Sequence, residues 1–229
     1  MKQISKLIIF IFILSNPGSV FCQDFTLPKI TLADKIDKVR IRCQNQEHLY
    51  TWDRRIEVTE NEKVMDVMIE NIEIEEDGKL QTKILNDESA NLPKFFLAHK
   101  IAEDEKKKME EYFSKLKDFL HDYSLHEKSK MVTFINNGSI DPSMEKVNLI
   151  ISGKNIIISG DRLIWWVNAS DYQFSKISVQ TTFEGDEVEF TATFKTLADD
   201  FNYIAFAEVA IPSKGLLLQI HNYDYVKMK

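Results

Sequence analysis

Hydrophobic residues recur along this chain with two different periods, and the positions where the period changes separate helices from strands. Residues 23–29 form a short lead that contains Pro28, after which a helix capped by Thr31 or Asp34 is expected to run to about Gln46. Its apolar face consists of residues spaced by four, three and four: Leu32, Ile36, Val39 and Cys43.

The period changes to two at Tyr50, which predicts a half-buried antiparallel strand over 50–59. Arg54 falls on the face that is otherwise apolar. Second and third strands are expected at about 63–74 and 79–84, joined by a turn at 76–78 whose glycine accepts a positive φ.

A helical period returns after a polar loop and predicts a helix over 98–125, roughly 40 Å long at 1.5 Å per residue. Its polar side includes the charged run 103–108, so the helix has one broad apolar stripe that must lie on another element. The stripe contains Ala98, Ile101, Ala102, Met109, Tyr112, Phe113, Leu116, Phe119, Leu120 and Tyr123. A short helix is expected at 130–135.

The rest of the chain is almost entirely of strand character. Seven strands are expected there, at 147–152, 155–159, 162–168, 173–183, 187–195, 203–211 and 216–225. The pattern contains neither βαβ alternation nor a repeat of fixed period. It therefore predicts an α+β fold in which a large antiparallel sheet is curved enough to wrap one long amphipathic helix.

Composition and charge exclude several classes of protein. The chain has 229 residues, 44% of them hydrophobic and 28% charged, with 7 Gly and 5 Pro, so it is neither disordered nor collagen-like. A total of 29 basic and 36 acidic residues gives a net charge of -7. An acidic chain without a concentrated basic stripe is a poor nucleic-acid binder. Two cysteines do not make a disulfide-dense scaffold.

Residues 1–22 have the composition of a secretory signal peptide. Positive residues precede an unbroken apolar run at 7–14, which is too short for a bilayer core that needs roughly 20 residues. Cleavage after Cys22 leaves 23–229 as a single domain, which we expect to be soluble and periplasmic. Acylation of Cys22 is the alternative, although the residue before an acylated cysteine is normally small and Phe21 is bulky.

The chain carries no glycine-rich phosphate loop and no G-x-S-x-G motif. His121 and His126 are five residues apart, whereas two zinc ligands on one helix face are spaced by three or four. We therefore expect no metal, no cofactor and no enzymatic activity. A hydrolase that uses scattered acids or His121 is kept as an alternative.

The aromatic residues point to a binding role, because the chain contains 15 Phe, 7 Tyr and 3 Trp. A sheet curved around a helix leaves an apolar concavity that suits acyl chains, whose burial is worth about 0.8 kcal/mol per CH₂. An ordinary packed core is the alternative. Arg54 meets either a ligand head group or a core acid. The residues expected to line the cavity are Trp52, Arg54, Ile56, Met109, Phe113, Trp165, Phe190 and Phe194.

From about residue 30 onwards, short motifs together resemble a bacterial branch of the outer-membrane lipoprotein-sorting protein superfamily, which is LolA-like and LolB-like. These motifs are Tyr50-Thr51-Trp52 with Arg54-Arg55 and Glu57-Val58, Asp77-Gly78-Lys79-Leu80-Gln81-Thr82, the helix 101–120, Lys130-Met131-Val132 and Trp166-Val167-Asn168. The resemblance implies an incomplete antiparallel barrel closed by helices, with an apolar cavity for lipid-modified chains. The segment 92–137 is unusually long for this superfamily.

These observations lead to three hypotheses. The first is a non-enzymatic periplasmic carrier or chaperone whose partners are lipids or the acyl chains of lipoproteins. The second is an envelope-stress sensor on the same scaffold, which presents the charged helix face 103–118 to a membrane-protein partner. The third is the secreted hydrolase. The sequence does not determine the oligomeric state.

Overall fold

The computed structural model describes residues 28–75, 80–87, 103–145 and 147–228, with the side chains of 86–87 and 103–110 excepted. The expected signal peptide therefore lies outside the described residues. Within them, no helix is both long and apolar enough to span a bilayer. The elements are α2 (Lys29–Glu47), β1 (Tyr50–Glu60), β2 (Lys63–Ile74), β3 (Leu80–Asp87), α4 (Glu103–His121), η2 (Asp122–Ser124), α5 (Lys128–Asn137), β4 (Ser139–Pro142), β5 (Asn148–Lys154), β6 (Arg162–Asn168), β7 (Phe174–Phe183), β8 (Asp186–Thr196), β9 (Asn202–Ile211), η3 (Pro212–Lys214) and β10 (Leu216–Lys227).

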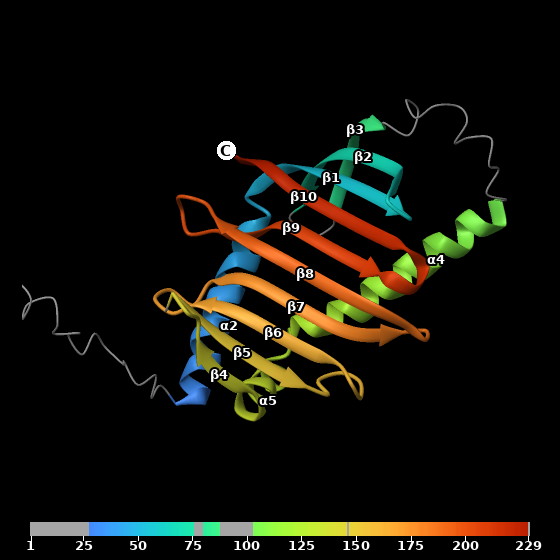
Figure 1. Cartoon of the computed structure of the whole chain (residues 1–229). Helices are drawn as coiled ribbons and strands as arrows, with labels where there is room; N and C mark the ends of the chain where they lie inside the picture. The colour runs from blue at the N-terminus through green and yellow to red at the C-terminus, as the bar shows by residue number, and fades with distance from the viewer. Residues whose placement is uncertain (1–27, 76–79, 88–102, 146, 229) are drawn as a thin grey trace, which may run out of the picture.

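All the strands in the described part of the chain belong to one antiparallel sheet, in the order β3-β2-β1-β10-β9-β8-β7-β6-β5-β4 (Figure 1). β1 and β10, the first and last of the described strands along the chain, are neighbours in the sheet, with Tyr50 of β1 opposite Lys227 of β10. The sheet is not closed into a barrel, since β3 and β4 are its two edges. The expected α+β fold with a large curved antiparallel sheet is confirmed.

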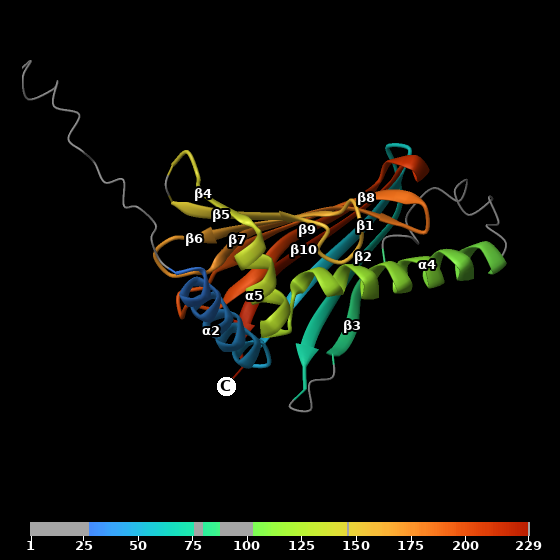
Figure 2. The same ribbon diagram turned by 90° about the horizontal axis from the view of Figure 1, so that it is seen from below.

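The sheet bends toward the helices. Figure 2 shows α2, α4 and α5 on one face, with β2 and β3 bending to the same side beyond α4. Register shifts, which bend and twist a strand, occur in β1 between Val58 and Thr59 and in β8 between Thr193 and Phe194. The helices therefore lie in a concavity, and α2 shares it with α4. The sheet does not wrap one helix alone.

Two helix ends differ from the predictions. Helix α4 ends at His121, four residues earlier than expected, and η2 follows it. Leu125, with a φ of 48°, turns the chain out of the helical path. At the start of α2 the capping residue is Pro28 rather than Thr31 or Asp34. The carboxylate of Asp34 instead pairs with Lys128 of α5 at 2.6 Å.

The structure differs from the sequence prediction at two strands: one expected strand is a loop, and one strand is not predicted. The expected strand 155–159 is a loop, because the backbone N–H groups of Ile156, Ile157 and Ile158 all donate to the carboxylate of Asp161. These three N–H groups are therefore not available for hydrogen bonds to a neighbouring strand. The short edge strand β4 was missed, since its four residues include Ser139 and Pro142 and carry no apolar alternation.

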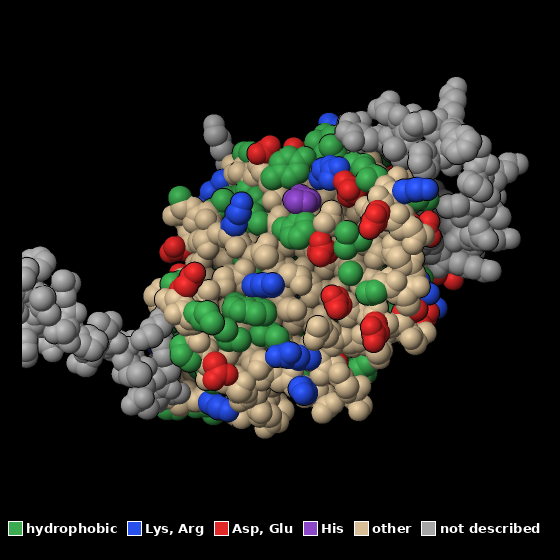
Figure 3. Space-filling model, in the orientation of Figure 1, with side chains coloured by type: hydrophobic (Ala, Val, Ile, Leu, Met, Phe, Trp, Pro, Cys, Tyr) green, Lys and Arg blue, Asp and Glu red, His purple; other side chains and the backbone are tan. Residues whose placement is uncertain are grey.

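The buried residues form separate clusters along the concave face. One joins α2 and α5 to β5–β7 around Trp165, and a second packs Leu116 of α4 against β8, β9 and β10. A third contains Tyr50, Trp52, Ile72 and Phe201. Figure 3 shows the opposite, helix-free face, where acidic and basic side chains are interspersed with hydrophobic ones. The apolar interior thus lies between the sheet and the helices, and Phe119, Leu120 and Phe190 pack against both the first and the second cluster.

Candidate functional site: a cavity between the helices and the sheet

A cavity of about 1940 Å³ lies between the sheet and the helices α2 and α4. It exceeds the range of roughly 300–1,000 Å³ that is typical of small-molecule pockets. Its lining comes from α2, from the C-terminal half of α4 with the turn that follows, and from β1, β2, β3, β7, β8, β9 and β10. Residues distant in sequence therefore form one partly open, mainly apolar space.

Strand alternation places the sheet side of the lining. The antiparallel register sets Arg54 opposite Asn222 and Val58 opposite Leu218, so that these side chains share the concave face. At the centre of the sheet, Ala192 of β8 is opposite Ala207 of β9, and both line the cavity. Two methyl groups leave this part of the concavity unfilled, whereas larger side chains would close it.

The helix side of the lining follows the helical period. On α2 the residues that line the cavity are Val39, Arg40, Cys43, Gln44 and Glu47, which recur at helical spacing on one face. On α4 they include Phe113, Leu116, Lys117 and Leu120. Burial raises the pKa of the Glu47 carboxyl, which stands at the last turn of α2. Cys43 is a free, half-buried thiol.

The structure brings five of the eight residues expected from the sequence into this lining: Trp52, Arg54, Phe113, Phe190 and Phe194. Ile56 is opposite Ile220, which lines the cavity, but Ile56 itself does not. Trp165 is fully buried in the core and lies outside the lining. The side chain of Met109 lies outside the described residues.

Arg54 already has a partner on the sheet. Its guanidinium donates to the Glu70 carboxylate of the neighbouring strand, at 2.7 Å from Nε and 2.5 Å from Nη2. Glu70 is 4% exposed, so a charge-assisted pair is the arrangement that permits its burial. Of the two roles considered for Arg54, the ion pair with a core acid is confirmed.

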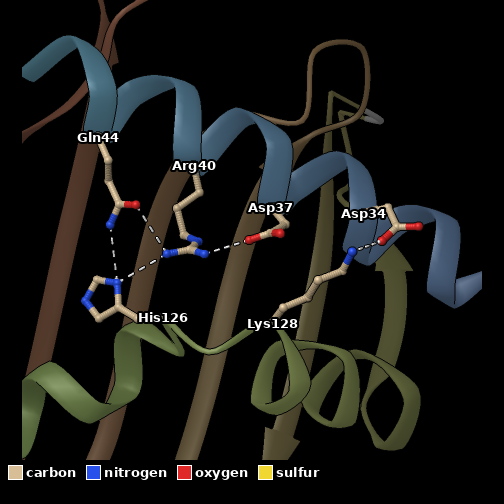
Figure 4. Close-up of polar contacts among 6 residues, drawn as sticks. All are labelled: Asp34, Asp37, Arg40, Gln44, His126 and Lys128. Carbon is tan, nitrogen blue, oxygen red and sulfur yellow. Dashed lines mark hydrogen bonds and ion pairs between the residues drawn. The ribbon is translucent and has the colours of Figure 1, made fainter.

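Sequence reasoning missed the polar residues that α2 and the turn after α4 add to the lining. Arg40 and Gln44 of α2 face His126, whose Nδ1 is 3.4 Å from Arg40 Nη1 and 3.4 Å from Gln44 Nε2 (Figure 4). The ring of His121 lies 4.3 Å from that of His126. The helical period placed Arg40 beside Val39 on α2, but it did not show that this face would lie over the sheet.

The described part of the chain contains no group of three or more His, Cys, Asp or Glu side chains arranged to hold a metal ion. The charged face expected to meet a membrane partner is described in part only. Glu111, Lys115 and Asp118 of α4 are exposed, and the side chains of 103–110 lie outside the described residues.

Three solved structures are similar to this chain. A DUF1329 family protein from Desulfovibrio piger has a TM-score of 0.40 at 9% identity, covering 87% of this chain and 91% of that one. A domain classed with the outer membrane lipoprotein-sorting proteins, from Vibrio parahaemolyticus, has a TM-score of 0.39 at 10% identity, covering 85% and 93%. A LolA superfamily protein from Nitrosomonas europaea has a TM-score of 0.30 at 10% identity, covering 87% and 92%.

No family model and no curated protein sequence matches the chain. The superfamily that the sequence motifs resemble is thus found among its structural neighbours. At these identities and TM-scores, neither the ligand nor the role of this chain follows from the likeness.

Proposed function

We propose that this chain is an exported, periplasmic, non-enzymatic binding protein for acyl chains, which it carries in the cavity between the sheet and α2 and α4. The observation that supports this most directly is the volume and lining of that space. It is about 1940 Å³, and the centre of its sheet wall is made of alanines and aromatic or aliphatic side chains. The ligands that suit such an apolar cavity are lipids or the acyl chains of lipoproteins.

The size of the cavity favours an aliphatic guest over a compact one. Burying an acyl chain is worth about 0.8 kcal/mol per CH₂ and requires no directional contacts. A long, flexible chain therefore gains affinity from a large apolar space without a dense set of polar groups.

The proposal is tested by filling the cavity from the sheet side. Ala207 lines the cavity, whereas Ala210 of the same strand is opposite Leu217 and Glu189 and, by alternation, points to the helix-free face. We expect Ala207→Trp to weaken binding of a fluorescent fatty acid roughly tenfold or more, because overpacking costs about 1–3 kcal/mol. The matched variant Ala210→Trp should bind like the wild type.

Native mass spectrometry of protein isolated from the periplasm provides the second measurement. We expect masses that correspond to co-purified lipid with the wild type, and fewer with Ala207→Trp. Absence of co-purified lipid, together with no uptake of the fluorescent fatty acid by the wild type, would contradict the proposed function.

A further inference from the structure

One side of the cavity carries a group of cationic and hydrogen-bonding side chains, which we call the α2 rim: Arg40, Gln44, His121 and His126. All four line the cavity. Figure 4 shows α2 facing the turn that leads to α5, with Arg40 and Gln44 pointing at His126. His121 and His126 are exposed, so the rim lies where the apolar space opens to water.

Arg40 has hydrogen-bonding capacity to spare. Its Nη2 donates to Asp37 Oδ1 at 2.6 Å. Its Nη1 reaches Gln44 Oε1 and His126 Nδ1 only at 3.4 Å each, and among the described residues its buried Nε has no partner. One short bond and two long ones leave most of the guanidinium available to a better acceptor.

The rim has more groups able to carry positive charge than carboxylates. His126 faces His121 from the end of α4 and Arg40 and Gln44 from α2, and Asp37 of α2 pairs with Arg40. Arg40 Nη1 and Gln44 Nε2 each lie 3.4 Å from His126 Nδ1. Burial, followed by the nearby His121 and Arg40, holds the pKa of His126 below its usual value. An added anion would relieve this repulsion.

The other charged groups in or near the cavity, apart from Lys117 of α4, do not offer this chemistry. Arg54 is occupied by Glu70, and the neighbouring Lys128 is paired with Asp34. Glu60 and Asp66 line the cavity at the β1–β2 turn, which is the end of β1 far from α2 (Figure 1). Glu47 of α2 also lines the cavity, so the cationic groups cluster at the α2 rim and not along the whole helix.

We infer that the α2 rim binds the anionic head group, a carboxylate or a phosphate monoester, of an amphiphile whose chain occupies the cavity. This inference rests on the proposed function. Arg40 supplies fixed charge and several donors, and a ring N–H of each histidine is a further donor. The apolar side chains next to the rim, such as Val39 and Leu120, meet the first carbons of the chain.

The test compares amphiphiles of equal chain length at about pH 8, where both acids are ionised: dodecanoate, monododecyl phosphate and the uncharged glycerol monododecanoate. We expect the wild type to bind at least one anionic ligand roughly tenfold more tightly than the neutral ester, as charge-assisted hydrogen bonds provide. Comparison of the two anions identifies the head group that the rim prefers.

Removing Arg40 alone would leave the buried Asp37 unpaired, so the variant is Asp37→Asn combined with Arg40→Gln. We expect it to lose the preference for anions and to keep the affinity for the neutral ester. Lys38→Gln is the matched control, because Lys38 is an exposed cation of the same helix that does not line the cavity. That variant should keep the preference.

An NMR titration of the His126 ring gives a readout that does not depend on the variants. Its pKa should rise when an anionic ligand binds and stay unchanged with the neutral ester. Equal binding of charged and neutral ligands by the wild type, or an equal loss of preference in the rim variant and Lys38→Gln, would overturn the inference and leave the proposed function standing. Failure of all three ligands to bind would overturn both.

Discussion

Asp161 fixes the loop between β5 and β6 and ties it to the end of α4. Its carboxylate accepts hydrogen bonds from the backbone N–H groups of Ile156, Ile157 and Ile158, at 2.6, 2.8 and 2.9 Å. It also accepts one from the buried hydroxyl of Tyr123 at 2.8 Å. Asp161 is 1% exposed, and four donors are what make a buried carboxylate acceptable.

Burial raises the pKa of Asp161, but the hydrogen bonds from the three N–H groups and Tyr123 outweigh it and hold the pKa below its ordinary value. Since the pKa in the folded state is lower than in the unfolded chain, the stability that this group contributes is fully present above the ordinary pKa. It is lost as the pH falls through the folded-state pKa.

Replacing Asp161 with Asn should destabilise the fold by about 2–3 kcal/mol at neutral pH, because charge-assisted acceptors are lost and an amide NH₂ faces backbone donors. For a chain of this size that corresponds to a fall in Tm of roughly 4–12 °C. Thermal unfolding followed by circular dichroism measures it.

The exposed Asp171, whose carboxylate accepts the N–H of Gln173, is the control, and Asp171→Asn should shift Tm far less. The difference between the wild type and Asp161→Asn should also shrink on acidification, as the wild-type carboxyl becomes protonated. A difference that grows as the pH falls would contradict this account of Asp161.

At the scale of the element, α2 is held over the cavity by a narrow set of side chains. Leu32, Ala33 and Ile36 are buried in the cluster shared with α5, and Ile36 has no exposed surface. Ile36→Ala should cost about 2–5 kcal/mol and loosen the wall that carries the α2 rim.

Ile41 of the same helix is 43% exposed, so Ile41→Ala is matched in chemistry and should cost less than about 0.5 kcal/mol. Urea unfolding gives both values, and hydrogen exchange of the α2 amides shows where Ile36→Ala acts. Equal costs for the two substitutions would mean that α2 is not anchored by its buried face.

The elements that could be predicted from sequence are those whose pattern is set by burial on one side. The strand expected at 187–195 is β8 at Asp186–Thr196, and the one expected at 63–74 is β2 at Lys63–Ile74. The run Ile156-Ile157-Ile158 misled the prediction, because a single carboxylate at Asp161 takes the donors that a strand would need. Hydrophobicity does not report such a competition.

The cavity could be predicted only in part, for the same physical reason. Alternation along β1 and β8 places Trp52, Arg54, Phe190 and Phe194 on one face, and the structure puts them in the lining. Whether a large aromatic fills the core, as Trp165 does, depends on which helix covers its strand. The position of a helix over the sheet depends on contacts between residues distant in sequence, and the periodicity within α2 does not predict it.

At the scale of the whole molecule, the tail of the proposed ligand contacts the apolar cavity and its head group contacts the α2 rim. A series of fatty acids from octanoate to hexadecanoate distinguishes the contributions of these two parts to binding. Each added CH₂ should tighten binding about fourfold, from about 0.8 kcal/mol per CH₂, until the chain fills the cavity and the gain stops. Calorimetric titration below the concentration at which the fatty acids form micelles measures the slope and the length at which it ends.

Substitutions on the sheet side of the cavity and at the α2 rim should change this dependence on chain length differently. Ala207→Trp occupies space on the sheet side, so the gain should stop at a shorter chain while short ligands bind as before. The rim variant Asp37→Asn with Arg40→Gln should weaken every member of the series by a similar factor and leave the slope unchanged. A flat dependence on chain length from octanoate onward would mean that the tail stays outside, and the cavity would lose its role as the acyl site.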